Sequence, residues 1–354
     1  MPRTTAKMTN LPHNLVTRRQ AASLALGLLA GGALPRVADA QAAATAPAEK
    51  VLIRFTWQVK GEHAPLFVAL DKGYFKDEGL DVDLAEGSGA ETVVKLIAQG
   101  IDKVGFGPAT TVAEGISHGL PVQVVAVYQP NTPIGLMSFP DVPLRTPKDL
   151  EGRKLGLTRN ESFSNLLEPF AALNHVDMSK VTKVILDYSA RNGLFMSRQL
   201  DIQSTFLNVD VPLMEGKFNI KFNTLKVSDF GLKLLGGGLF VNRQYADANP
   251  EIISKLLRAI AKGYRDAYSD PAAAAASLYQ HLKTKVPQDI LEKQLRITME
   301  DMDMKSDKPL GWQNGEAWRS NIELLHQVGV IQNVGNVDDY YTNRYFANAG
   351  ATPK

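Results

Sequence analysis

Residues 53–84 constrain the fold of this chain more than any other stretch, because strand and helix patterns follow one another there in a fixed order. Apolar and polar residues alternate at the start of the stretch and again over residues 80–84, as they do in half-buried strands. Between these segments, residues 63–72 place apolar side chains on one face of a helix, and Gly73 suits a helix end. The stretch therefore predicts one strand-helix-strand unit of an α/β sheet.

The polar loop after the first of these strands is a candidate ligand site, because ligands of open α/β sheets bind outside the carboxyl ends of the strands. The loop and the start of the helix place Trp57, Lys60, Glu62 and His63 at this edge. Trp57 is either a stacking platform for a flat conjugated ligand or a packing residue. His63 either donates a hydrogen bond to a ligand carbonyl or carboxylate, or caps the helix.

The alternation of strands and helices continues to Tyr128 and starts again at Pro147, after a proline-rich segment. A second crossing at Gly236–Gly238 would return the chain to the first group of strands as a flexible strand or bulge. We therefore expect two doubly wound α/β lobes joined by a two-segment hinge, with C-terminal helices and a ligand between the lobes. The expected first lobe comprises residues 51–138 and 236–354, and the second comprises residues 139–235.

Three local patterns make specific predictions about single elements. Ser88 with Glu91 fits a capping box at a helix start. Residues 122–128 are almost wholly apolar, as a buried parallel strand should be. The pattern over residues 194–199 predicts a helix in the second lobe.

Other candidate ligand residues lie at predicted strand ends or helix starts. The backbone N–H groups near Ser88 and Gly89 either bind an anion or carbonyl, or only cap a helix. Phe106 is either a cleft wall or a core residue, and Arg159 is either a bidentate carboxylate partner or a solvated loop residue. The remaining candidates are Tyr128, Asn131, Phe163, Tyr188, Asn208 and Asp210.

The first 40 residues predict an export signal. A basic leader ending in Arg18-Arg19 precedes an apolar run, and Ala38-Asp39-Ala40 forms a small-x-small cleavage pattern. The twin arginine favours the export route for folded proteins, and an ordinary Sec signal is the alternative. The run is too short for a permanent membrane anchor. We expect cleavage near Ala40, a flexible lead over residues 41–50, and a periplasmic monomer.

The charge of the chain excludes a basic nucleic-acid or membrane-binding class. The 354 residues carry a formal charge of +2, but the leader holds five basic residues and one acidic residue. Subtracting these from the 39 basic and 37 acidic residues of the chain leaves 34 and 36, so the expected mature chain is slightly acidic.

Several catalytic motifs are missing from the sequence. There is no cysteine, and the six histidines have no metal-binding spacing. No nucleophile elbow, P-loop or complete dinucleotide fingerprint is present. These absences favour a site without a metal or a resident cofactor.

The segment from Lys72 to Val82, KGYFKDEGLDV, resembles the signature of periplasmic solute-binding proteins of ABC importers. The branch it resembles covers thiamine pyrimidine precursors, riboflavin, nitrate, alkanesulfonates, taurine and aromatic acids. Further similar stretches are Gly119 to Val122, Pro147 to Gly156 and Asn249 to Glu251. The resemblance spans about residues 51–285 and implies the type II periplasmic-binding-protein fold, delivery of a solute to an ABC permease, and no catalysis.

The same resemblance suggests site residues. In the pyrimidine-precursor branch, an aromatic residue after the first strand and a histidine before the first helix line the cleft. These correspond to Trp57 and His63. The acidic residue after the third strand of the second lobe falls at Asn208 or Asp210.

The aromatic candidates at the cleft, from Trp57 to Tyr188, favour a planar aromatic or heteroaromatic solute, such as a thiamine pyrimidine precursor. Nitrate, an alkanesulfonate, taurine or an aromatic carboxylate is the alternative. The eukaryotic pyrimidine-precursor synthases share this fold and offer an enzymatic alternative, but they carry a cysteine-rich motif and lack export signals. A tethered sensor module is a third interpretation, and no membrane signalling domain accompanies it in this sequence.

Overall fold

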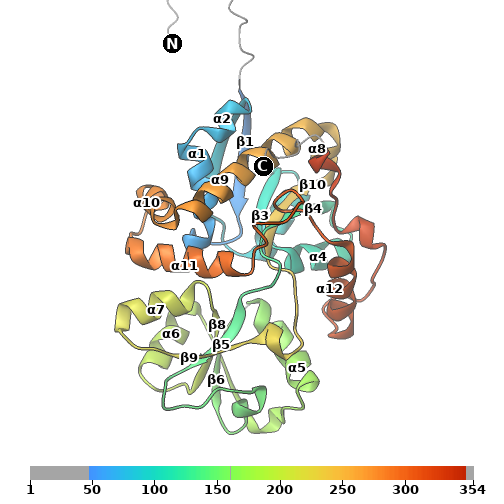
Figure 1. The fold of residues 1–354 in the computed structure, drawn as a ribbon. Helices are drawn as coiled ribbons and strands as arrows, with labels where there is room; N and C mark the ends of the chain where they lie inside the picture. The colour runs from blue at the N-terminus through green and yellow to red at the C-terminus, as the bar shows by residue number, and fades with distance from the viewer. Residues whose placement is uncertain (1–47, 160, 348–354) are drawn as a thin grey trace, which may run out of the picture. The chain divides into compact units, whose positions relative to one another are not determined.

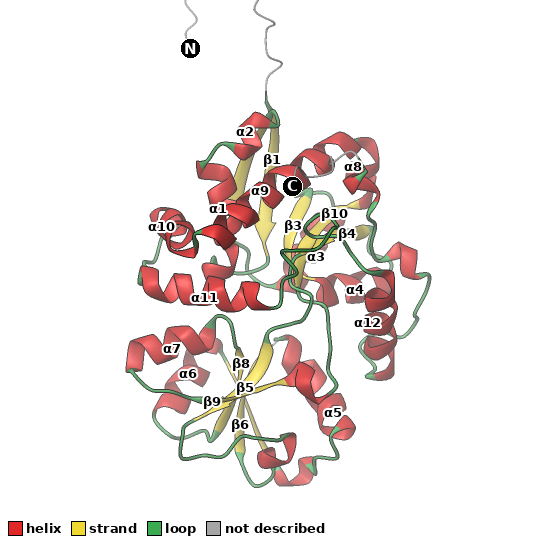
Figure 2. Cartoon of the chain, viewed as in Figure 1, coloured by secondary structure: helices red, strands yellow, loops and turns green. Residues whose placement is uncertain are grey.

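The computed structural model describes residues 48–159 and 161–347. These residues form two five-stranded sheets flanked by helices (Figures 1 and 2), which confirms the predicted α/β class. Both sheets belong to one structural unit, Pro47–Lys354. The predicted export signal lies outside the described residues.

The first sheet has the strand order β2-β1-β3-β10-β4. Strand β1 pairs in parallel with β2 and β3, and β10 pairs antiparallel with β3 and β4. The strands are β1 (Glu49–Phe55), β2 (Leu80–Ala85), β3 (Val104–Pro108), β4 (Val122–Val127) and β10 (Gly237–Asn242). The prediction of a parallel strand at residues 122–128 is wrong in its partner, because the returning strand β10 inserts between β3 and β4. Burial on both faces explains the continuous apolar pattern of β4 equally well.

The second sheet has the strand order β7-β6-β8-β5-β9. Strand β6 pairs in parallel with β7 and β8, whereas β5 pairs antiparallel with β8 and β9. The strands are β5 (Ile134–Ser138), β6 (Lys154–Thr158), β7 (Thr182–Leu186), β8 (Ile202–Phe206) and β9 (Asn223–Lys226). Strand β5 therefore belongs to the second sheet, although we expected the first lobe to extend to residue 138. Strand β1 likewise begins at Glu49, inside the lead expected over residues 41–50.

Twelve α-helices occur in the described part of the chain. They are α1 (Ala64–Asp71), α2 (Tyr74–Asp77), α3 (Ala90–Ala98), α4 (Ala109–Ser117), α5 (Ser162–Leu173), α6 (Tyr188–Met196), α7 (Asp210–Phe218), α8 (Arg243–Ala248), α9 (Pro250–Ser269), α10 (Pro271–His281), α11 (Gln288–Glu300) and α12 (Gly315–Gln327). Short 3-10 segments include η1 (Gly61–His63) and η2 (Pro147–Leu150). None of the helices in the described ranges combines the length and apolarity needed to cross a bilayer.

Two helix predictions are corrected by the structure. Helix α3 is capped by Gly89, with φ at 145°, and no side chain caps it, so the predicted capping box of Ser88 and Glu91 does not form. The Gly89 N–H donates to the Thr56 carbonyl at 2.9 Å, which ties this turn to the loop after β1. The helix predicted at residues 194–199 is α6, which starts six residues earlier, at Tyr188, and ends at Met196.

The segment that resembles the solute-binding signature packs against α9. Lys72 Nζ lies 2.7 Å from Asp266 Oδ2, and the Tyr74 hydroxyl donates to the same carboxylate. Further along, Arg258 pairs with Glu78 at 2.8 Å. The segment thus positions α1, α2 and β2 on the long C-terminal helix.

The two connections between the sheets run side by side. The Gly236 N–H donates to the Gln129 carbonyl at 3.0 Å, and the Thr132 N–H donates to the Leu234 carbonyl at 2.7 Å. The Gly237 N–H donates to the Gln129 side-chain oxygen at 3.0 Å. Gln129 therefore joins both connections through its backbone and its side chain.

Candidate functional site

An aromatic cluster lies where β1, β3 and β4 of the first sheet end. Ring centroids are 4.4 Å apart for Phe55 and His63, 5.8 Å for His63 and Phe106, and 6.0 Å for Phe106 and Tyr128. Tyr128 stacks in turn on Tyr264 of α9 at 4.5 Å. All five side chains are buried, so His63, Phe106 and Tyr128 contact one another inside the first-sheet core.

His63 is held in one neutral form within the aromatic cluster. The Lys60 N–H donates to Nδ1 at 3.0 Å, so the ring proton resides on Nε2. Burial lowers the pKa of His63, against opposing contributions from Glu62 and the Lys60 backbone. Nε2 lies 3.9 Å from Glu62 Oε1, beyond hydrogen-bonding distance. His63 thus presents an N–H donor toward a neighbouring carboxylate without bonding to it.

The loop after β1 carries an exposed residue of the expected site. Trp57 is 47% exposed. Ser88, in the loop between β2 and α3, is also exposed. The Gly87 N–H donates to the Trp57 carbonyl at 3.4 Å, which holds the two loops together. Trp57, Ser88 and Gly89 therefore form one surface at the end of β1 and β2.

A polar cluster joins this edge to the second sheet; the name junction cluster is used below for Glu62, Gln129, Asn208, Gln294 and Thr298. Asn208 Nδ2 donates to Glu62 Oε2 at 2.8 Å, and Gln129 Nε2 donates to the same oxygen at 3.0 Å. Asn208 Nδ2 also lies 2.9 Å from Thr298 Oγ1 on α11. Glu62 thus accepts hydrogen bonds from a connection and from the segment after β8.

Helix α11 holds the junction cluster from one side. The Gly61 N–H donates to Gln294 Oε1 at 2.8 Å, and Gln294 Nε2 donates to the Val209 carbonyl at 2.9 Å. One glutamine side chain therefore bonds to the loop after β1 and to the segment after β8. Asn208 Oδ1 is buried and has no hydrogen-bond partner among the described residues.

A pocket of about 160 Å³ lies beside the junction cluster. It is lined by Asn131 and Asn208 of the expected site, together with Gln129, Lys226, Thr298, Asp301 and five further residues of the same segments. A larger pocket of about 470 Å³ borders β2, Phe67 and His281, and none of the expected site residues lines it. Of these two pockets, the smaller one therefore includes residues that the sequence placed at the ligand.

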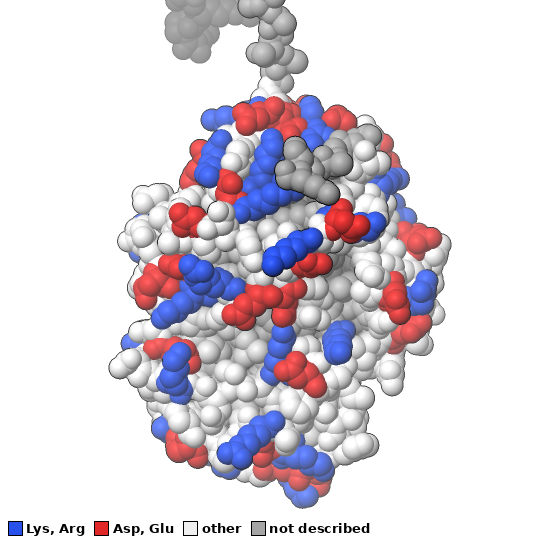
Figure 3. Space-filling view, in the orientation of Figure 1, with Lys and Arg blue, Asp and Glu red and all other residues white. Residues whose placement is uncertain are grey.

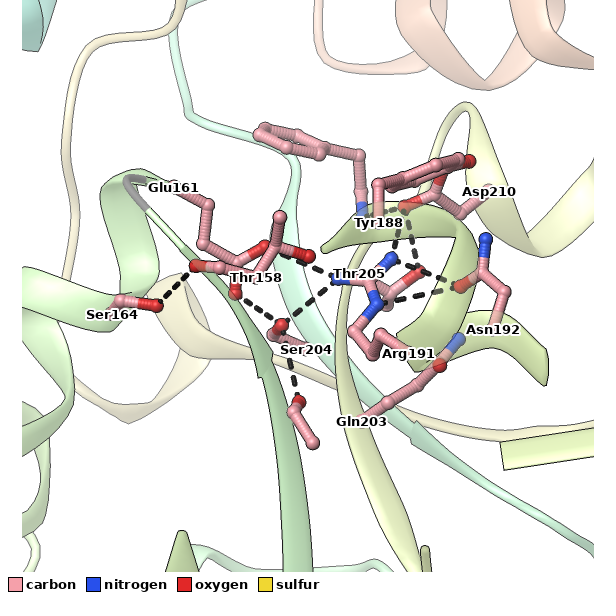
Figure 4. A network of polar contacts seen from close by, with 12 residues as sticks. Thr158, Glu161, Ser164, Tyr188, Arg191, Asn192, Gln203, Ser204, Thr205 and Asp210 are labelled. Atoms are coloured by element: carbon pink, nitrogen blue, oxygen red, sulfur yellow. Dashed lines mark hydrogen bonds and ion pairs between the residues drawn. The ribbon is translucent and has the colours of Figure 1, made fainter. Parts of the chain in front are cut away.

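A second polar group, the arginine network, lies at the strand ends of the second sheet (Figure 4). Arg191 of α6 is 1% exposed, and its Nη1 lies 3.1 Å from Glu161 Oε2 and 3.0 Å from Ser204 Oγ. Its Nη2 lies 3.6 Å from Asp210 Oδ2. The Tyr188 hydroxyl donates to Asp210 Oδ1 at 2.8 Å, so one buried guanidinium bridges two carboxylates.

Burial dominates the electrostatics of the arginine network. Desolvation raises the pKa of the Glu161 carboxyl, and the Arg191 charge opposes this rise. Desolvation and the Asp210 charge together raise the pKa of the Tyr188 phenol, which stays protonated. Asp210 also accepts from the Phe206 N–H at 3.0 Å, so its oxygens are engaged by protein groups.

The remaining expected residues are dispersed. Phe163 is buried and packs edge-on against Phe170 at 5.7 Å, within the core of the second sheet. Arg159 is exposed after β6. Asn208 joins the junction cluster, whereas Asp210 joins the arginine network. The structure thus brings His63, Phe106 and Tyr128 together in one place, and Tyr188 and Asp210 in another.

Sequence reasoning placed Glu62 at the ligand edge but assigned it no role, and it missed Gln129, Glu161, Arg191 and Gln294. Gln294 lies 233 residues from its partner Gly61, which no local pattern reveals. Arg191 was missed because α6 was predicted to start only at residue 194.

The described residues contain no cluster of three metal-ligating side chains. On the face in Figure 3, basic and acidic side chains are interspersed.

Comparison with known proteins gives this arrangement a context. Residues 60–274 match the family model described as NMT1/THI5 like. The riboflavin-binding protein RibY of Chloroflexus aurantiacus is 24% identical over 84% of this chain and 86% of its own length. The formylaminopyrimidine-binding protein of Halalkalibacterium halodurans is 25% identical over 78% of this chain and 84% of its own length. A 4-amino-5-hydroxymethyl-2-methylpyrimidine phosphate synthase of Aspergillus parasiticus is 22% identical over 84% of this chain and 88% of its own length.

Solved structures match the whole architecture. The periplasmic aliphatic sulphonate binding protein SsuA from Escherichia coli aligns with a TM-score of 0.67 at 14% identity, covering 83% of this chain and 92% of SsuA. This similarity confirms the predicted periplasmic-binding-protein fold.

Proposed function

Because this chain belongs to the NMT1/THI5-like family, we propose that it is the solute-binding component of an ABC importer. Two relatives are binding proteins for riboflavin and formylaminopyrimidine, and each aligns with most of the chain. The protein captures a small molecule between two lobes and delivers it to the membrane subunits of the importer. It works as a periplasmic monomer after its export signal is removed near Ala40.

The hydrogen bond from Asn208 to Glu62 carries this proposal. It links a residue after β8 of the second sheet to a residue after β1 of the first, at 2.8 Å. Gln129 bonds to the same Glu62 oxygen and also to the second connection, through Gly237. Hydrogen bonds between the two lobes link the position of one lobe to that of the other. A protein that captures a solute by closing its lobes requires such a link.

The solute is a planar aromatic or heteroaromatic compound. Trp57 is 47% exposed at the end of β1, and a stacked ring would cover this surface. Ring stacking contributes about 0.5–1.5 kcal/mol beyond the burial of area. Nitrate, an alkanesulfonate and an aromatic carboxylate are the alternatives, and the exposed Arg159 is the partner available to a carboxylate.

Two measurements test the proposal. Protein purified from periplasm is examined by native mass spectrometry for a co-purifying solute, and apo protein is titrated with riboflavin, an aminopyrimidine, an alkanesulfonate, nitrate and phthalate by calorimetry. We expect micromolar or tighter binding of a planar compound and at least tenfold weaker binding by Trp57→Ala. If none of these compounds binds and no solute co-purifies, the proposed function is wrong.

The protein has no catalytic role in this proposal. A pyrimidine phosphate synthase is among the relatives. The eukaryotic pyrimidine-precursor synthases considered in the sequence analysis carry a cysteine-rich motif, and this chain has no cysteine. A pyrimidine phosphate product formed by the purified protein would identify an enzyme instead.

A further inference from the structure

Three hydrogen-bonding positions around the junction cluster are unused among the described residues. Glu62 Oε2 accepts two amide N–H groups, whereas Oε1 has no hydrogen-bond donor. Because the Glu62 carboxylate can only accept, Asn208 must turn its NH₂ toward it, which leaves the buried Asn208 Oδ1 without a donor. His63 Nε2 lies 3.9 Å from Glu62 Oε1, beyond hydrogen-bonding distance. Two acceptors and one donor therefore lack partners within the described part of the chain.

Negative charge exceeds positive charge among the buried and half-buried groups at the strand ends. Glu62, Glu161 and Asp210 are carboxylates, and Arg191 is the buried cation that faces the latter two. The other nearby cations are engaged or exposed: Lys226 Nζ lies 2.6 Å from Asp301 Oδ2, Lys60 Nζ lies 3.3 Å from Gln58 Oε1, and Arg159 is exposed. Burying an anion next to this excess would be costly, because a like charge and desolvation both disfavour it.

One backbone donor at each of two helix starts is already bonded within the protein. Anions are often bound by free N–H groups at helix N-termini. Here the Gly89 N–H at the start of α3 donates to the Thr56 carbonyl, and the Ala109 N–H at the start of α4 donates to the Gly236 carbonyl at 2.8 Å. These two N–H groups are therefore not free to bind an anion.

We propose that the solute is a neutral or cationic nitrogen-containing compound that donates a hydrogen bond to Glu62, and that Glu62 is the residue that excludes anions. This inference rests on the proposed function and narrows its solute class. An amino group would donate to Glu62 Oε1, and an adjacent ring nitrogen or carbonyl would accept from His63 Nε2. Nitrate, methanesulfonate and carboxylates offer acceptors only, and they would leave Glu62 Oε1 without a donor.

Calorimetry with matched ligands tests the charge selection. 4-Aminopyrimidine and pyrimidine-4-carboxylate share a ring and differ in charge, and nitrate and methanesulfonate represent the anionic classes. We expect the wild-type protein to bind the amine at least tenfold more tightly than any of the anions. Glu62→Gln should reduce the ratio of the affinity for the amine to the affinity for the anions at least tenfold. Glu62→Asp retains the charge and should still reject the anions.

Glu292→Gln is the matched control, because Glu292 lies on α11 outside the junction cluster and pairs with Arg296. It should keep the wild-type ratio, and circular dichroism should show that all variants are folded. Preferential binding of an anion by the wild-type protein overturns the inference but leaves the proposed function intact. An unchanged ratio in Glu62→Gln also overturns it. Failure of every compound, riboflavin included, overturns both.

Discussion

The two sheets end in different chemistry, although the same alternation of strands and helices builds both. At the first sheet, Phe55, Phe106 and Tyr128 pack around a neutral histidine. At the second, Arg191 bridges Glu161 and Asp210 in a buried ionic network. One end is therefore held by apolar contact and ring packing, and the other by ion pairs around a buried guanidinium.

This difference predicts different responses to mutation. An aromatic cluster loses contacts gradually, because each ring pair contributes a small and separable amount. A buried ionic network fails abruptly, because the removal of one charge leaves another unpaired in a low-dielectric environment. Substitutions at the second sheet should therefore be more costly than similar changes at the first.

The largest effect is expected for Arg191→Met. The substitution leaves Glu161 and Asp210 buried without their cation, and breaking a buried pair in this way costs about 3–5 kcal/mol. Urea denaturation measures the loss in free energy of unfolding. The control is Arg296→Met, which removes an exposed pair with Glu292 and should change stability by about 0.5 kcal/mol or less. Equal losses in the two variants would contradict the comparison.

The next effect is expected for Tyr188→Phe. The lost hydroxyl donates to the Asp210 carboxylate at 2.8 Å, and hydrogen bonds to charged groups contribute about 1.5–3 kcal/mol. The free energy of unfolding should fall by this amount, with no change in the dependence on urea concentration. A variant as stable as the wild type would show that Asp210 does not depend on this donor.

The sequence predicted the local elements better than the contacts between them. Strands β1 and β2 have clear alternation, and both overlap the segments predicted within residues 53–84. Helix α6 was predicted late because its first turns are polar and only residues 194–196 form an apolar run. The sequence therefore predicts where a helix or strand lies along the chain only where its apolar residues form a pattern.

The site was harder to predict because its contacts join distant segments. Glu62 and Asn208 are 146 residues apart, and no periodicity in either segment indicates that they meet. Phe106 and Tyr128 were identified as aromatic residues at strand ends, but the sequence left open whether they face a ligand or a core. Only the packing around His63 and Tyr264 distinguishes these alternatives.

A smaller, pH-dependent effect is expected at His63. Burial lowers its pKa in the folded protein; Glu62, the hydrogen bond to the Lys60 backbone and Glu86 oppose this shift, and the Lys60 charge adds to it. Below pH of about 6.5 the unfolded chain binds a proton here that the folded chain does not, so the free energy of unfolding falls with decreasing pH. The slope from this residue is at most about 1.4 kcal/mol per pH unit.

Chemical denaturation at pH 7.5, 6.5 and 5.5 isolates the His63 contribution when the wild type is compared with His63→Gln. The wild type should lose more stability than the variant between the two lower pH values. Glu161 acts in the opposite direction, because its raised pKa favours the folded state on acidification, and its contribution is common to both proteins. Parallel pH profiles would show that His63 titrates normally.

The smallest effect has the opposite sign and concerns Tyr128→Phe. The Tyr128 hydroxyl is buried in the aromatic cluster, and no described residue is its hydrogen-bond partner. Burial also raises the pKa of the phenol, so the group stays neutral and unsatisfied. Removal of such a hydroxyl should stabilise the protein by about 0.5–1 kcal/mol, whereas the same change at Tyr188 destabilises it. If both variants lose stability, the first-sheet end contains a polar contact that ring packing does not explain.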